Sequence, residues 1–406
     1  MVATHVNSLR IASALSRLKD APSTADELVN SVRRQLGSAP VDLAFLFVSS
    51  HHFDQAAVLC EALRQSLSPK TFVGCTGEGV IATAREVEQG PAATLWAAHL
   101  PAVALQPLRL SFSGIHDRFS LHGWPDEHFA EGESPVLLLF ADPFSTPMQD
   151  VLSLIETRYP AAVALGGLAG GGKDVGENKL FLDGELYSDG LVGVALAGNV
   201  LVRTVISQGC RPIGERFIVT KAEQNVIHEL GGEPALSCLE RVFSSLSSSE
   251  RSLAQRALHI GIAMNEHRAQ FGRGDFLIRN LLGADQQTGA VVIGDMVQEG
   301  QTVQFQVRDA DSADKDLRHL LSGSAETRHP APQGALLFSC CGRGKGLFGR
   351  ADHDAGVLEE HLGNIPVSGF FAQGEVGPVG GRNFLHGYTA SIALFLDPSR
   401  RVPECE

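Results

Sequence analysis

One alternation of apolar and polar segments occurs three times along the chain. Each copy begins with a short, continuously apolar run, which predicts a buried strand, and continues through a polar loop into a helix, a second strand and a cluster of glycines. The copies occupy residues 41–80, 136–172 and 334–377. The spacing within the loops differs, so we expect three β-α-β units of one kind rather than a strict sequence repeat.

Antiparallel signals separate these copies. Alternating runs flank Gly184 and the pair Gly198-Asn199, which is typical of tight hairpin turns. Further apolar runs between residues 259 and 307 predict an antiparallel meander. The pattern therefore predicts an α/β fold of two domains, whose mixed sheets combine recurring β-α-β units with antiparallel hairpins.

The domain limits are expected near a glycine pair that begins at Gly231. Residues 1–40 are predicted to be a helical lead-in, with one helix in the first nineteen residues and another starting at a capping box, Thr24 to Glu27. The alternative for the first nineteen residues, which lack acidic side chains, is a transit peptide. The remaining limits are 41–231 and 232–397 for the two domains and 398–406 for a tail.

Composition and charge argue against several classes of protein. Hydrophobic residues make up 44% and charged residues 19% of the 406 residues, as in ordinary globular proteins. The net charge of −13 opposes binding to nucleic acid or anionic membranes, and no apolar run is long enough to cross a membrane. The seven cysteines form no CxxC pairs, which argues against a disulfide framework and favours a reducing compartment, so we expect a cytoplasmic protein.

The third copy carries the strongest candidate site. Its first predicted strand runs into a loop of small residues that contains Cys340, Cys341 and Arg343, and its second strand ends at Gly374-Glu375. Loops that follow the strands of an open α/β sheet are where such folds usually bind ligands. We therefore expect a ligand site in these loops.

Arg343 lies between Gly342 and Gly344 in the first of these loops. Its guanidinium can bind a ligand carboxylate through two parallel hydrogen bonds, and the glycines leave backbone N–H groups open to an anion. The alternative is an arginine that pairs with a nearby acid and holds the loop.

Two glutamates follow a glycine at a predicted strand end, Glu375 after Gly374 and Glu78 after Gly77. A carboxylate at this place can bind an amino group, so a guanidinium and a glutamate together suit a zwitterionic amino acid. The alternative is a structural carboxylate that accepts backbone N–H groups in a tight turn.

The two adjacent thiols admit an enzymatic interpretation. Neighbouring residues on a strand point to opposite faces, so at most one of Cys340 and Cys341 faces the pocket. A cysteine nucleophile needs a base, for which His353, His361 and His386 are candidates. The alternative is a buried, inert cysteine.

Three further polar residues are secondary candidates. Arg211 follows a cysteine and precedes a proline, and is either a second anion ligand or a clamp between domains. Arg279 and Asn280 project into a pocket if their strand lines it. A structural role is the alternative for each.

Several motifs are rejected. Gly167 to Lys173 approaches a phosphate-binding loop, but Asp174 stands where Ser or Thr is needed. The histidines, among them His116, His122 and His128, show no zinc-ligand spacing, and no cofactor motif is present. We therefore expect no metal and no cofactor.

Taken in order, six stretches resemble the FIST family of sensory proteins, with a FIST_N part followed by a FIST_C part, over about residues 41–396. The stretches are Gly74 to Glu78, Gly209 to Gly214, Gly274 to Asn280, Cys341 to Gly344, Gly369 to Glu375 and Asn383 to His386. The resemblance implies a protein that binds small ligands such as amino acids and signals to partners. Some relatives bind haem through histidine, but no local motif supports haem here.

The resemblance favours a ligand-binding sensor of signal transduction, for amino acids or related small carboxylates. Many members carry a fused output module, whereas residues 1–40 and 397–406 are too short for one, so we expect a separate protein partner. The alternatives are a cysteine-dependent enzyme that uses Cys340 or Cys341, and an adaptor protein. An enzyme is the less favoured of these interpretations.

Overall fold

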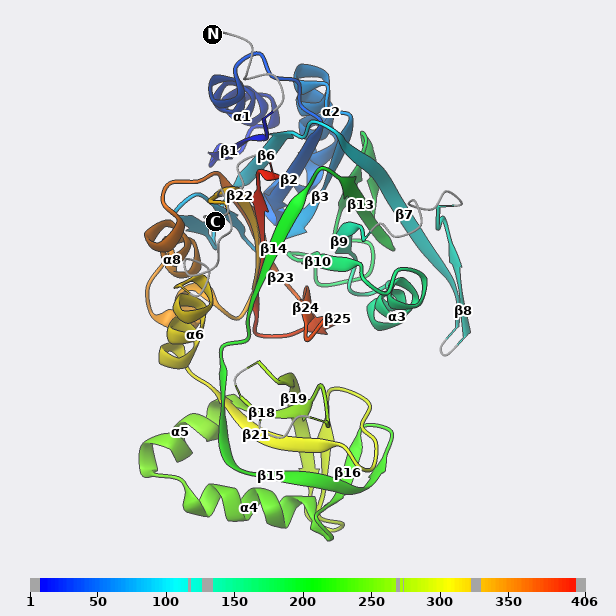
Figure 1. Ribbon diagram of the computed structural model, residues 1–406, viewed down its shortest axis with the longest axis vertical. Coiled ribbons are helices and arrows are strands. Elements are labelled where there is room, and N and C mark those ends of the chain that lie inside the picture. The colour runs from blue at the N-terminus through cyan, green and yellow to red at the C-terminus, as the bar shows by residue number, and fades with distance from the viewer. Residues whose placement is uncertain are drawn as a thin grey trace, which may run out of the picture. The chain divides into compact units, whose positions relative to one another are not determined.

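The computed structural model describes residues 8–115, 118–125, 134–267, 271–272, 274–322 and 330–398. The chain forms two compact units (Figure 1). Unit 1 comprises Met1–Ile206, Arg318–Leu385 and Thr389–Glu406, and unit 2 comprises Ser207–Leu317 and His386–Tyr388. All three predicted β-α-β units therefore belong to unit 1.

Unit 1 contains three mixed sheets, each built around one β-α-β unit. The first sheet has the order β1 (Arg10–Ser16), β6 (Ala93–His99), β2 (Leu43–Ser49), β3 (Thr71–Gly77), β11 (Leu180–Leu182) and β12 (Glu185–Tyr187). The second has the order β25 (Arg382–His386), β24 (Glu375–Val379), β10 (Val163–Leu168), β9 (Val136–Ala141), β13 (Leu191–Gly198), β7 (Val103–Ile115) and β8 (Arg118–His122). The third has the order β14 (Leu201–Ser207), β26 (Ala390–Leu396), β22 (Pro332–Cys340), β23 (Val367–Ala372), β4 (Val80–Ala82) and β5 (Arg85–Val87).

The predicted β-α-β units are confirmed. The pairs β2–β3, β9–β10 and β22–β23 are parallel, as a helical crossover requires. The crossovers contain the helices η1 (Ser50–Gln55) and α2 (Ala56–Leu67) in the first unit, α3 (Met148–Arg158) in the second, and α7 (Gly344–Phe348) and α8 (His353–Leu362) in the third.

The N-terminal lead-in is not wholly helical. Residues Arg10–Ser16 form strand β1, which pairs with β6 along its full length, in place of the expected first helix. The alternating burial of this short segment suits the edge of a sheet better than a helix. The second expected helix is α1 (Ala21–Leu36), which Asp20 caps.

The hairpin after each unit pairs with a different unit. Hairpin β4–β5 follows β3 but pairs with β23, hairpin β11–β12 follows β10 but pairs with β3, and hairpin β24–β25 follows β23 but pairs with β10. These exchanges form a closed cycle. Three backbone hydrogen bonds repeat around it: Glu78 N–H to Phe371 O (3.1 Å), Gly170 N–H to Thr76 O (3.0 Å) and Gln373 N–H to Leu168 O (3.1 Å).

A glycine in the second strand of each unit marks equivalent positions in the cycle. Gly74, Gly166 and Gly369 lie opposite Leu46, Leu139 and Leu337 of the neighbouring parallel strand. A Cβ atom at these glycines would lie 1.9, 1.9 and 1.8 Å from the leucine carbonyl oxygens. We call them the marker glycines. Residues at the same distance from the marker glycine, or from the leucine opposite it, are counterparts in the three β-α-β units.

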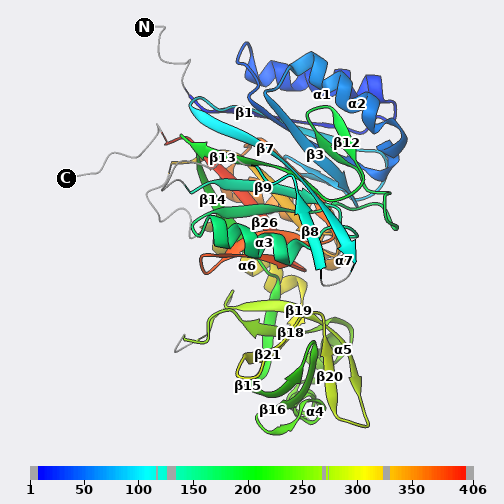
Figure 2. The ribbon, with the colours of Figure 1, turned by 90° about the vertical axis from the view of Figure 1, so that its right-hand side faces the viewer.

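The inner faces of the three sheets share one apolar core. The rings of Phe47, Phe140, Phe338 and Phe370 come from all three sheets, with centroids 5.0 to 6.2 Å apart. Helices α1 and α2 cover the outer face of the first sheet (Figure 2), and α3 covers that of the second, each over its own apolar cluster. The central core therefore joins the first two copies of the pattern to the third.

Unit 2 is built on one antiparallel sheet, as the meander predicts. Its strand order is β15 (Cys210–Glu223), β21 (Thr302–Arg308), β18 (Leu258–Ala263), β19 (Phe276–Asp285), β20 (Ala290–Ile293), β16 (Val226–Leu230) and β17 (Glu233–Pro234). Helices α4 (Ala235–Ser245) and α5 (Ser248–Ala257) pack on one face, and α6 (Ala310–Ser322) begins in this unit and continues into unit 1. Gly231, near which the sequence pattern places a boundary, lies inside this unit between β16 and β17.

We predict that Gly369→Ala destabilises the protein by at least about 3 kcal/mol, because its Cβ would overlap the Leu337 carbonyl oxygen. Urea unfolding of the variant measures this loss. The matched control is Gly356→Ala in α8, where a Cβ meets nothing within 4 Å, and where alanine is expected to stabilise the helix by roughly 0.5–1 kcal/mol. Equal stability of the two variants would contradict the prediction.

Candidate functional site

The loop after β22 is held by backbone hydrogen bonds to two neighbouring strands. The Cys340 N–H donates to Thr389 O and the Cys341 N–H to Ala372 O, both at 2.9 Å. Cys340 is buried and Cys341 is exposed, as the alternation along a strand requires. The carboxyl end of β22 therefore presents one thiol to the interior and one to solvent.

Arg343 is fully buried and bound to an acid of the protein itself. Its Nε and Nη2 donate to the two carboxylate oxygens of Asp354, at 2.7 and 2.9 Å. Asp354 also accepts hydrogen bonds from Ser339 Oγ and His353 Nδ1. The guanidinium thus holds its own loop to α8, while Nη1 remains buried with no hydrogen-bond partner among the described residues.

The pair carries opposite charges in the interior. Burial alone would lower the pKa of Arg343, but the Asp354 carboxylate outweighs it and the pKa is raised. Burial alone would raise the pKa of Asp354, but Arg343 outweighs it and the pKa lies far below its ordinary value. Asp354 therefore stays ionised at a lower pH than an exposed aspartate does, and its charge balances that of Arg343.

Glu375 is fully buried at the start of β24. Its Oε2 accepts the Thr389 N–H at 3.0 Å, and its Oε1 has no hydrogen-bond partner in the part of the chain that the structure describes. Burial, together with the neighbouring Cys340 thiol, raises the pKa of Glu375 well above its ordinary value, against the opposing effects of the Thr389 hydrogen bond and Arg343. Glu375 therefore holds its proton to a higher pH than an exposed glutamate does.

The counterparts of Glu375 in the other two hairpins are aliphatic. Val80 pairs with Phe370, Leu180 pairs with Cys75, and Glu375 pairs with Gly167. In each case the residue on the second strand of the β-α-β unit comes directly after the marker glycine. Val80 and Leu180 are fully buried in the central core. The fold thus accepts an apolar side chain at the place where the third hairpin has a carboxyl group.

The N–H that Glu375 binds also has counterparts, and a serine satisfies each of them. The Ala92 N–H donates to Ser49 Oγ at 3.0 Å, and the Gly190 N–H donates to Ser145 Oγ at 2.8 Å. Ser49 is the counterpart of Cys340, counted from the marker glycines. A serine at the strand end would therefore satisfy the Thr389 N–H without any carboxylate.

Glu86 is a second buried carboxyl group that faces the third unit. Its Oε1 accepts the Ala355 N–H at the start of α8, at 2.9 Å, and its Oε2 has no partner among the described residues. Burial, and then repulsion from Asp354, raises the pKa of Glu86 to about 8. Nearby, Glu88 Oε1 accepts the Lys345 N–H, and Asp352 accepts the Glu86 N–H.

Glu78 and Glu375 do not occupy equivalent positions. Counted from the marker glycines, Glu78 corresponds to Gln373, and its own side chain is exposed and accepts the Gly171 N–H at 3.2 Å. Gly77 packs against Phe370, where a Cβ would lie 2.8 Å from the phenylalanine Cβ. Glu78 therefore lies beside β23, and the likeness of the two Gly-Glu pairs is one of sequence alone.

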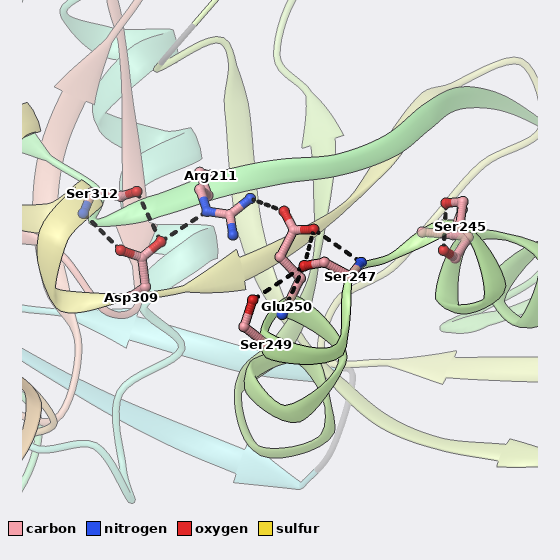
Figure 3. A network of polar contacts seen from close by, with 8 residues as sticks. Arg211, Ser245, Ser247, Ser249, Glu250, Asp309 and Ser312 are labelled. Carbon is pink, nitrogen blue, oxygen red and sulfur yellow. Dashed lines mark hydrogen bonds and ion pairs between the residues drawn. The ribbon is translucent and has the colours of Figure 1, made fainter.

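The remaining candidates lie in unit 2. Arg211 pairs with Asp309 at 2.9 Å and with Glu250 at 3.3 Å, so it ties β15 to β21 and α5 within that unit (Figure 3). Arg279 pairs with Asp295, and Asn280 accepts a hydrogen bond from Tyr388. Arg279 and Asn280 are neighbours on β19 and point to opposite faces of the sheet, so they do not line one pocket.

Sequence reasoning missed three residues of the site: Asp354, Thr389 and Glu86. Asp354 carried a signal, because an acid in the first turn of a helix shortly after a buried arginine is a natural partner for it. Glu86 carried none, because it reaches Ala355 from 269 positions away through an exchanged hairpin.

Within the described ranges, no group of His, Cys, Asp or Glu is arranged to hold a metal ion. In the same residues, no helix is both long and apolar enough to cross a membrane. His122 bonds Ser113, while His116 and His128 lie outside the described residues.

Two known families match consecutive parts of the chain. Residues 42–233 match the FIST N domain and residues 235–378 match the FIST C domain. The chain belongs to the FIST family. FIST domains are associated with sensory signal transduction, so this FIST protein belongs to a class of sensory proteins.

Two FIST relatives match over nearly their full length. The chain is 43% identical to the uncharacterized protein Rv0628c of Mycobacterium tuberculosis, over 389 residues that cover 96% of this chain and 100% of the relative. It is 42% identical to the uncharacterized protein Mb0898c of Mycobacterium bovis, covering 96% of this chain and 99% of the relative. The two family segments meet at residues 233–235, inside unit 2 of this FIST protein.

We predict that Glu86 makes the FIST protein less stable as the pH rises. Its folded pKa of about 8 lies above its ordinary value of 4.5, so between these values the folded state binds more protons than the unfolded state. The stability that protonated Glu86 contributes is complete below about pH 4.5 and is lost as the pH rises through 8. Urea unfolding at pH 5 to 8 measures the slope.

Glu86→Gln is the matched variant, because its amide oxygen can still accept the Ala355 N–H. We expect the variant to gain stability relative to the native protein as the pH rises, whereas Glu375 keeps its own contribution to the slope in both. A difference that stays constant from pH 5 to 8 would contradict this assignment.

Proposed function

We propose that this FIST chain is a sensory protein that binds a small ligand, an amino acid or a related small carboxylate, at the carboxyl end of β22. The binding groups are Arg343 and Glu375, with Gly374 and the loop residues Cys341, Gly342 and Gly344 around them. Gly77 and Glu78 lie beside β23 and form the rim. Arg211, Arg279 and Asn280 of unit 2 are not part of this proposed site.

The observation that carries the proposal is that Glu375 occupies a position at which the other two hairpins have an aliphatic residue. Two counterparts in the same fold, Val80 and Leu180, are apolar, so a carboxyl group at this place is not required for folding. Burying a carboxyl oxygen without a partner costs free energy, and natural proteins retain such groups chiefly at functional sites.

Arg343 complements this group. Asp354 fixes the guanidinium through two hydrogen bonds and leaves Nη1 as a donor in a set orientation. A neutral Glu375 is also a donor through its Oε1 hydroxyl. Two donors suit the oxygens of a carboxylate, whereas an ammonium group would bind only after Glu375 loses its proton.

The signal is proposed to pass to a protein partner, in keeping with the association of FIST domains with signal transduction. The cytoplasm remains the predicted location, from the use of cysteine.

We predict that the double variant Cys340→Ser with Glu375→Val folds normally and no longer responds to the ligand. The two changes introduce the residues found at the equivalent positions of the first β-α-β unit and its hairpin, Ser49 and Val80. The serine hydroxyl is expected to accept the Thr389 N–H, and the valine to fill the core. A thermal-shift screen against amino acids and small carboxylates measures the response. A ligand at a hundred times its Kd adds about 2.7 kcal/mol to the free energy of unfolding of the native protein.

Val80→Leu is the matched control, since it alters the equivalent core position of another hairpin, is not one of the proposed binding groups, and should keep the ligand response. A double variant that the same ligand stabilises as much as it does the native protein would disprove the assignment of Glu375. A double variant that fails to fold would show that Glu375 is a structural residue.

We further predict that the ligand class is visible in the protons exchanged on binding. An ammonium group bound to Glu375 favours the ionised form, and the pKa of Glu375 is raised, so an amine ligand is expected to release protons on binding, whereas a simple carboxylate is not. Titration calorimetry of each screening hit in two buffers of different ionisation enthalpy measures the number of protons released. Proton release by a ligand without an amino group would contradict the roles given to the two residues.

A further inference from the structure

The chain changes unit twice within a few residues near its C-terminal end. His386–Tyr388 belongs to unit 2, whereas Leu385 and Thr389, on either side, belong to unit 1. Tyr388 has a backbone φ of +67°, in the left-handed region that residues other than glycine rarely adopt. Such a conformation persists only where surrounding contacts enforce it, and it is found disproportionately at functional sites.

The contacts that hold Tyr388 come from three adjacent strands of unit 2. Its ring lies 4.3 Å from the His259 ring and 4.7 Å from the Arg308 guanidinium, and its hydroxyl donates to Asn280 Oδ1. The ring also packs on the apolar cluster that contains Phe276 and Ile278. Register places His259 opposite Asn280 on the same face of the sheet. The ring is therefore fixed in unit 2 by stacking, charge and hydrogen bonding together.

The next residue is fixed in unit 1 by the proposed ligand site. The Thr389 N–H donates to Glu375 Oε2 at 3.0 Å, and the Thr389 carbonyl accepts the Cys340 N–H at 2.9 Å. In the other two β-α-β units, the counterparts of Tyr388 are Pro91 and Asp189, both of which lie in unit 1. Among the three β-α-β units, the third alone has this N–H directly after a residue that belongs to compact unit 2.

We infer that the Tyr388–Thr389 peptide carries the state of the Glu375 site to unit 2. This inference rests on the proposed function, because it assigns the route by which ligand binding at Glu375 is reported. A peptide group is planar, so a rotation that turns the Thr389 N–H away from Glu375 Oε2 also turns the Tyr388 carbonyl and changes the ψ angle of Tyr388. A narrow left-handed backbone well and a fixed ring make that response two-state rather than gradual.

The coupling has to act in both directions. A ligand that draws Glu375 away from Thr389 favours the released state of Tyr388, and a partner that holds the Tyr388 ring changes the affinity for the ligand by the same factor. Unit 2 is thus assigned as the part of the chain whose state changes with occupancy of the site.

Fluorine NMR of the full chain labelled with 3-fluorotyrosine tests this without a ligand. The chain has three tyrosines, Tyr159, Tyr187 and Tyr388, so the spectrum is simple, and the Tyr388→Phe variant identifies the third signal. We expect the Tyr388 signal to shift or split in Glu375→Gln and in the double variant Cys340→Ser with Glu375→Val. The signals of Tyr159 and Tyr187 should stay in place. Val80→Leu is the matched control and should move none of the three.

Hydrogen exchange tests the reverse direction. Tyr388→Gly relieves the left-handed backbone and removes the ring, so the Thr389 amide should exchange roughly five- to tenfold faster, while the equivalent Ala92 amide should keep its rate. An unmoved Tyr388 signal in both Glu375 variants, or an unchanged Thr389 exchange rate, would overturn the inference. A ligand screen without hits would weaken the proposed function but leave these two measurements intact.

Discussion

Unit 1 depends on the exchange of hairpins among its three β-α-β units. Strands β4 and β11 have three residues each, and a hairpin this short is not stable by itself in water. Each becomes stable by pairing with the second strand of a different unit, and the cycle closes after three steps. The marker glycines let paired parallel strands approach closely at the same level in every sheet. A change at one of them is therefore expected to affect all three units.

The near-repetition of the units gives an internal reference for each side chain. Val80 and Leu180 show what the fold requires at the start of a hairpin, and Ser49 and Ser145 show how it satisfies the N–H that follows. In the third β-α-β unit, Glu375 stands at the start of the hairpin and also satisfies the N–H. Its Oε2 accepts the Thr389 N–H, and its Oε1 has no hydrogen-bond partner among the described residues. Because the other units fold without such a group, stability alone does not account for it.

Sequence patterns predicted the units but not the way in which they assemble. The apolar runs of β2, β9 and β22 are local signals, and so are the glycine clusters that follow the second strands. The pairing of β4 with β23 is not a local signal, because it joins residues nearly the whole chain apart, and three residues carry too little alternation to specify a register. The strand β1 was missed for a related reason, since its pairing with β6 decides its structure.

The candidate site shows the same division between local and distant information. The glycine loop and Arg343 were recognisable because their chemistry lies within a few residues. The special position of Glu375 became visible only through the register of an exchanged hairpin with Gly167. The resemblance between two Gly-Glu pairs suggested an equivalence that the backbone does not have, because Glu78 corresponds to Gln373 when both strands are counted from their glycines.

The charges around the third unit constrain what it can bind. One guanidinium, Arg343, lies near three buried carboxyl groups, and Asp354 takes its charge through two hydrogen bonds. The pKa values of Glu86 and Glu375 are raised, so burial opposes the ionisation of both groups. A buried ion pair of this kind adds little stability over an apolar core, but it fixes the orientation of its members. A ligand carboxylate that enters here therefore meets an oriented guanidinium whose charge Asp354 already balances.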